Sequence, residues 1–176
     1  MANVNGNLIL SKGVVFMKSI TYGEVSIQQV VEIIEKYVSK NPHSEYQVIV
    51  GTDSQNFDKT KIVLVIAVIE KTKGGIFFYE ITNVNRITNI KQKLYTETQM
   101  SLDCATKLMD AFENRFEETG FDYTKVQFSI HVDAGFNGPT KEVIPEIVGW
   151  VKSCGYDVHV KPESFVASSI ADKLSK

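Results

Sequence analysis

Residues 46–70 read YQVIVGTDSQNFDKTKIVLVIAVIE and contain two stretches that are typical of β-strands. The first stretch, 46–52, is short and rich in β-branched residues. The second, 61–70, is apolar on both faces, which predicts a central strand in a sheet that is covered on both sides. Residues 73–75 are Lys-Gly-Gly and favour a tight turn, and 76–81 predict a third strand, so the three strands should form a meander.

Alternating strands and helices follow this meander. The apolar spacing of residues 91–118 predicts a long helix, and 126–132 predict a fourth strand. A helix with Pro145 in its first turn, a fifth strand at 156–160 and a final helix at 164–173 complete the pattern. A meander followed by strands that are joined through helices indicates a mixed α/β sheet, in which the later strands run parallel to the first.

An additional helix is predicted before the first strand. Apolar residues recur at helical spacing between residues 25 and 38, and Ser26 and Gln29 have the spacing of a capping box. We therefore expect residues 1–44 to form an N-terminal extension whose helix packs on the same domain. Residues 45–176 should form the main domain.

The composition restricts the class of protein. The chain has 176 residues, 43% of them hydrophobic, and a net charge of -2, which excludes a disordered chain and a strongly basic nucleic-acid binder. Its two cysteines suit neither a disulfide framework nor a metal site, which favours a reducing compartment. The longest apolar run, 62–69, is too short to cross a bilayer as a helix, and residues 1–12 lack the features of a signal peptide. We expect a soluble cytoplasmic protein that does not bind membranes.

Acidic residues follow two of the predicted strands. Asp53 comes directly after the first strand, and Asp133 comes directly after the fourth. If these strands are parallel neighbours, the two residues lie at one edge of the sheet about 5 Å apart. Carboxylates at this separation repel each other unless a cation lies between them, and Mg²⁺ prefers oxygen ligands. The alternative is that each Asp only stabilises a turn or caps a helix.

Several segments resemble the YkuK-like family of bacterial ribonuclease H-like proteins. The segments are GTDSQ (51–55), YTETQMSLDCATKL (95–108), HVDAGFNG (131–138), NGPTKEVIPEIVGWV (137–151) and KPESFVASSIADKLSK (161–176). The resemblance implies a ribonuclease H-like α/β fold. Its five-stranded mixed sheet would have the order 3-2-1-4-5, with flanking helices and the extra N-terminal helix.

The resemblance also implies a set of acids that bind metal and act in catalysis. These acids are Asp53, Glu97, Asp133 and Asp172. Glu97 and Asp172 lie on predicted helices, where each is alternatively an acid that faces solvent. Glu80 and Asp103 are nearby candidates for the place of Glu97, although Asp103 lies six residues further along the helix and should face away from Glu97.

Carboxylates that hold two Mg²⁺ or Mn²⁺ ions suit the hydrolysis of phosphodiester bonds. We therefore predict a metal-dependent nuclease, and leave open its oligomeric state and whether it acts on an RNA–DNA hybrid, DNA or RNA. Four residues near the acids are candidates for binding the substrate: Ser54, Gln55, Asn137 and Lys141. Five lysines are candidates for lining a groove: Lys91, Lys93, Lys141, Lys161 and Lys173. The alternative for each is an ordinary role in a turn, a helix cap or the solvated surface.

Two other functions remain open. A module of the same fold that binds metal or nucleic acid without turnover is favoured by the acidic pI of about 5.9. It is also favoured by the lack of His between Val160 and Ala171, where many ribonucleases H have one. A nucleotide phosphohydrolase shares the strand-and-helix plan, but neither 51–53 nor 133–135 belongs to a longer Gly-rich phosphate-binding loop.

Overall fold

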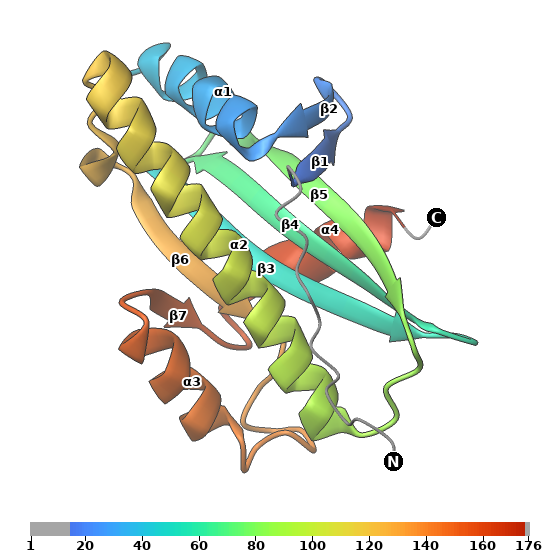
Figure 1. The fold of residues 1–176 in the computed structure, drawn as a ribbon. Helices are drawn as coiled ribbons and strands as arrows, with labels where there is room; N and C mark the ends of the chain where they lie inside the picture. Colours follow the sequence, from blue (N-terminus) through green and yellow to red (C-terminus); the bar gives the residue numbers. More distant parts are fainter. Residues whose placement is uncertain (1–14, 175–176) are drawn as a thin grey trace, which may run out of the picture.

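The computed structural model describes residues 15–174 and has a single sheet with helices on both faces (Figure 1). The strands are β1 (Phe16–Ser19), β2 (Gly23–Ser26), β3 (Tyr46–Asn56), β4 (Thr60–Glu70), β5 (Gly74–Val84), β6 (Gln127–Val132) and β7 (Asp157–His159). The helices are α1 (Ile27–Ser39), α2 (Ile90–Thr119), α3 (Ile144–Ser153) and α4 (Val166–Leu174), with a short 3₁₀ helix at Tyr123–Lys125. The strand order is β2-β1-β5-β4-β3-β6-β7.

The five strands from β3 to β7 have the predicted arrangement. β4 pairs antiparallel with both β3 and β5, whereas β6 pairs parallel with both β3 and β7. Counted among themselves, these strands have the expected order 3-2-1-4-5. The sheet therefore places the ends of β3 and β6 side by side.

The prediction of five strands was wrong, because β1 and β2 extend the sheet to seven. These two strands pair antiparallel with each other, and β1 joins the sheet through the pair Lys18 and Tyr79. Each has only four residues, which is too short to show a recognisable strand period in the sequence. Their hydrogen-bonded pairing defines them as strands, and this pairing cannot be read from the sequence alone.

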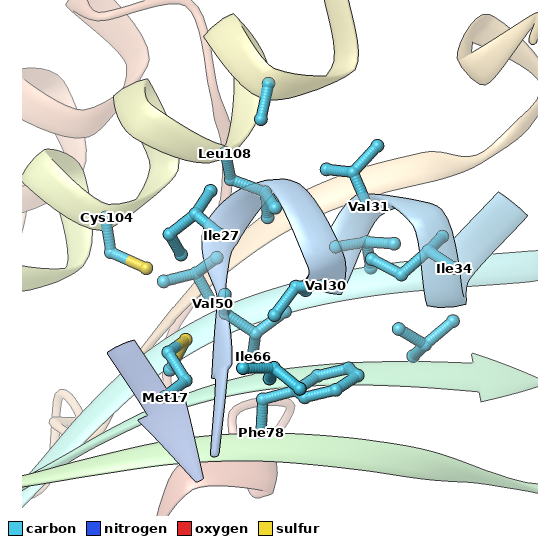
Figure 2. Packing of buried hydrophobic residues seen from close by; sticks show 14 of the residues in the cluster. Met17, Ile27, Val30, Val31, Ile34, Val50, Ile66, Phe78, Cys104 and Leu108 are labelled. Carbon is cyan, nitrogen blue, oxygen red and sulfur yellow. The ribbon is translucent and has the colours of Figure 1, made fainter. Parts of the chain in front are cut away.

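Helices α1, α2 and α3 lie on one face of the sheet, and α4 lies on the other (Figure 1). Figure 2 shows the core beneath α1, where Val30 and Ile34 approach Ile66 and Phe78 of the sheet. On the opposite face, Ile49 packs in a cluster with residues of α4. Residues 1–14 of the predicted N-terminal extension lie outside the described part of the chain, and the expectation about a signal peptide concerns residues 1–12 among them. Within residues 15–174, none of the helices combines the length and apolar character that crossing a membrane requires.

The predicted capping box at the start of α1 is confirmed. The Ser26 hydroxyl accepts a hydrogen bond from the Gln29 backbone N–H (3.2 Å), and the Gln29 side chain accepts one from the Ser26 N–H (2.8 Å). We expect Ser26→Ala to lower the free energy of unfolding by about 1 kcal/mol, because one N–H of the first turn loses its partner. Urea titration measures this effect, and Ser39→Ala at the exposed far end of α1 is the control. Equal midpoints for the two variants would contradict the prediction.

Candidate active site

The parallel pairing of β3 with β6 brings Asp53 and Asp133 to the same edge of the sheet. The last pair of this ladder is Thr52 and Val132, so each acid is the next residue along its chain. Asp133 follows β6 directly, as predicted. Asp53 does not follow β3 but lies within it, because pairing with β4 continues as far as Asn56 and Thr60. On one side of β3, pairing with β4 continues past Asp53. On the other side, pairing with β6 ends at Thr52, so Asp53 has no strand partner there among the described residues.

A cavity of about 610 Å³ opens at this edge. Three of the four predicted acids line it, namely Asp53, Glu97 and Asp133. The loop 134–140 after β6 forms one wall, and the first turns of α2 form another. The topology therefore collects acids that are about forty residues apart in sequence into one concave site.

Glu97 is held in the cavity by the buried face of α2. Leu94, Thr98 and Ser101 on the same face are also buried, so Glu97 points toward the sheet with only 8% of its surface exposed. The Ser54 hydroxyl donates a hydrogen bond to its carboxylate. The competing acids Glu80 and Asp103 do not line the cavity.

Burial and crowding of negative charge disfavour ionisation of these acids. Burial raises the pKa of Glu97 to about 7, against the opposing effects of the Ser54 hydrogen bond and the Lys93 charge. Burial also raises the pKa of Asp53, and repulsion by Asp133 raises it further. Such shifts are typical of sites in which acids are gathered for a function.

Asp172 is the one predicted acid that does not line the cavity. It is exposed on α4, although its charge contributes to the raised pKa of Asp53. Helix α4 packs close to β3 because Gly51 has no side chain: a Cβ there would lie 3.0 Å from the Cβ of Ala167. Helix α4, which carries Asp172, lies on the far face of the sheet from α2 (Figure 1).

The four predicted substrate-binding residues divide into two pairs. Ser54 and Asn137 line the cavity, whereas Gln55 and Lys141 do not. Gln55 lines a second hollow with Lys61 and Ala171, which Asp53 and Ser54 also line. Lys141 has an exposed side chain.

Two of the five candidate lysines enter the cavity. The ammonium of Lys93 donates a hydrogen bond to the Ser54 carbonyl (3.1 Å). The Lys161 Nζ lies 3.1 Å from Asp133 Oδ1 in an ion pair whose geometry does not form a hydrogen bond. The cavity therefore combines acids with cations.

The sequence prediction missed the apolar wall of the cavity. Phe136, in the loop after β6, is 51% exposed, and Ile90, at the start of α2, is 45% exposed. A large apolar residue inside the Gly- and Asn-rich run AGFNG was a signal that could have been used.

The donor chemistry of the site fits a hard divalent cation. Carboxylate oxygens from Asp53, Glu97 and Asp133 line the cavity, and Asp133 Oδ1 is buried without a hydrogen bond. Within residues 15–174, however, no three Asp, Glu, His or Cys side chains converge closely enough to hold a metal ion as they stand. The site has the ligands but not a preformed arrangement of them.

Comparison with known proteins gives a family and a relative. The profile of a family described as "Ribonuclease H-like" matches residues 29–176. A protein of Bacillus subtilis (strain 168), named "Uncharacterized protein YkuK", is 29% identical over 164 residues, which cover 90% of this chain and 95% of that protein. No solved structure matches the chain.

Proposed function

Because the chain belongs to the ribonuclease H-like family, we propose that it is a metal-dependent nuclease that hydrolyses phosphodiester bonds in nucleic acid. The observation that carries this proposal is the gathering of Asp53, Glu97 and Asp133 in one open cavity. Surface acids that only aid solubility have no reason to share a concave, partly buried site. The raised pKa values of Asp53 and Glu97 support a functional role for the same residues.

We propose that Asp53, Glu97 and Asp133 hold Mg²⁺ or Mn²⁺, with Asp172 as a fourth acid that adds negative charge beside Asp53. Ions of this kind lower the pKa of an attacking water and stabilise the leaving oxygen of a phosphodiester. The remaining contributions come from the chain itself. Ser54 orients the Glu97 carboxylate through its hydrogen bond, and Lys93 and Lys161 attract the negatively charged phosphate into the cavity.

A module that binds metal or nucleic acid without turnover is the second candidate function. It is favoured by the lack of a preformed metal-binding group in the part of the chain that the structure describes. The ion pair of Lys161 with Asp133 also favours it, since a cation of the protein already contacts one of the acids.

A cleavage assay tests the proposal. The purified protein is incubated with labelled RNA–DNA hybrid, single-stranded RNA, single-stranded DNA, duplex DNA, a branched junction or ATP, each with Mg²⁺, Mn²⁺ or EDTA. A nuclease should cut at least one of these polymers, and EDTA should stop the reaction. Binding without cutting would support the second candidate. Release of phosphate from ATP alone would indicate a nucleotide phosphohydrolase.

A further inference from the structure

We propose that Lys161 is a tethered counter-ion of the acid site, which neutralises Asp133 in the metal-free protein and must move away before a divalent cation binds there. This inference rests on the proposed function, since it concerns the same acids. It assigns a role to a residue that does not belong to the four predicted acids.

The backbone fixes where Lys161 enters the site. Its N–H donates a hydrogen bond to the Ala134 carbonyl (2.8 Å), which ties it to the residue after Asp133. Gly135 packs against it so closely that a Cβ on Gly135 would lie 3.1 Å from the Cβ of Lys161. The start of the lysine side chain is therefore held in place, whereas the side chain as a whole is 53% exposed, which leaves its end free to move.

The charges of the cavity explain why an ammonium group lies there. Asp133 Oδ1 is buried and accepts no hydrogen bond, and an ionised carboxylate in such a place needs a neighbouring positive charge. Lys161 supplies that charge at 3.1 Å, whereas Lys93 donates to the Ser54 carbonyl instead. An ammonium and a divalent cation repel each other, so both cannot occupy the same side of Asp133.

Binding of Mn²⁺ in the absence of any substrate tests this role. We expect Lys161→Met to tighten Mn²⁺ binding by about tenfold, a limited effect because the half-exposed ammonium is screened by water and salt. Lys161→Arg keeps the charge and should stay within about twofold of the wild type. Lys152→Met, on the exposed face of α3, is the matched control and should also bind like the wild type. Calorimetry and the electron paramagnetic resonance signal of free Mn²⁺ both measure the affinity.

The possible results separate this inference from the proposed function. If the wild type and Lys161→Met bind Mn²⁺ equally, the counter-ion role is overturned and the metal site stands. If no variant binds Mn²⁺, both are overturned. A thermal melt in EDTA establishes that Lys161→Met is folded. Comparison of the Mn²⁺ affinities of Lys161→Met and Lys161→Arg measures the effect of the positive charge a second time.

The apolar wall of the cavity carries a second inference. We infer that the cavity takes an unpaired nucleotide whose base stacks on Phe136, which again rests on the proposed function. Phe136 and Ile90 come from different elements and expose about half of their side chains next to the acids. Large apolar groups exposed in a concave site indicate a ligand with an apolar surface.

The chemistry of nucleic acids identifies which part of the substrate fits this wall. In a duplex the faces of the bases are covered by their neighbours, whereas an unpaired base can stack on an aromatic ring. A single nucleotide also combines a flat apolar base with a phosphate, which matches a cavity with Phe136 on its wall and Lys93 and Lys161 among its lining residues. We therefore expect single strands or unpaired ends to be preferred over a closed duplex.

Fluorescence anisotropy with labelled oligonucleotides in EDTA tests the stacking role without any cleavage. Phe136→Ala should weaken the binding of a single-stranded oligonucleotide by about tenfold or more. Phe57→Ala removes an aromatic ring that is at least as exposed, in the turn between β3 and β4 and outside the cavity lining, and should have no effect. A strand of abasic sugar-phosphate units should bind the wild type and Phe136→Ala alike, since neither complex then contains a stacked base.

Equal binding of the normal strand by Phe136→Ala and the wild type would overturn the stacking role. Equal affinity for a blunt duplex and a single strand would overturn the preference for an unpaired nucleotide. Either result leaves the proposed nuclease activity untouched if a polymer is cut in the cleavage assay.

Discussion

Asp53→Asn is expected to reduce metal-dependent cleavage by more than about 100-fold while the protein remains folded. The substitution keeps the size of the side chain but removes the negative charge that the proposed metal site needs. The fold should tolerate it, because the pKa of Asp53 is already raised by burial and by repulsion from Asp133. The measurement is the rate of cleavage of whichever polymer the wild type cuts, together with a melting curve. Asp133→Asn should give a similar loss of cleavage.

The matched control is Asp58→Asn, which removes the same charge from an exposed position in the turn between β3 and β4. This variant should cleave at the wild-type rate. If Asp53→Asn is folded and cleaves the polymer as fast as the wild type, the assignment of Asp53 to the active site is wrong.

Glu97→Gln is expected to stabilise the metal-free protein at pH 8 by on the order of 3 kcal/mol, and to have almost no effect at pH 4. Burial raises the pKa of Glu97 from 4.5 in the unfolded chain to about 7 in the folded protein. Between these values the unfolded chain has lost the proton and the folded protein has kept it, so the free energy of unfolding falls as the pH rises. Gln has no proton to lose, and its side-chain carbonyl can still accept the Ser54 hydrogen bond.

Urea titrations in EDTA at several pH values between 4 and 8 measure this effect. Glu113→Gln, on the exposed face of α2, is the control and should follow the wild-type pH profile. A Glu97→Gln variant that is less stable than the wild type at pH 8 would show that the carboxylate is favourable in the metal-free fold. That outcome would contradict the interpretation that the ionised Glu97 carboxylate is unfavourable in the folded protein when no cation is bound.

Much of the fold could be predicted from the sequence because its elements are long and regular. β4 is an apolar run, α2 has a long buried stripe, and the helix ends at Gly120, which adopts a left-handed conformation at the helix C-terminus. β1 and β2 could not be predicted, since four residues carry little periodicity and the pairing of β1 with β5 joins residues that are distant in sequence. The extension of β3 past Thr52 was missed for a similar reason, because β4 continues to pair with it there.

The candidate site was accessible to sequence reasoning only in part. The neighbouring positions of Asp53 and Asp133 could be predicted, since each comes directly after the part of its strand that pairs in parallel with the other. Glu97 required the resemblance to a family, because a helical acid near Glu80 and Asp103 carries no sign of its own that it is buried. Gln55 and Lys141, which the sequence also favoured, lie outside the cavity that these acids line.

The sequence by itself determined the α/β class and the strands that carry Asp53 and Asp133, because these depend on local periodicity and on short connections, whereas the order of the five strands from β3 to β7 was implied by the family resemblance. Only the tertiary structure decided that Lys161 contacts Asp133, that Phe136 lines the same cavity and that Asp172 stands apart from it. These relations depend on how loops and helices that are distant in sequence pack against the sheet edge. No repeating pattern along the chain encodes such packing, since it arises from the shapes and charges of side chains that meet only after folding.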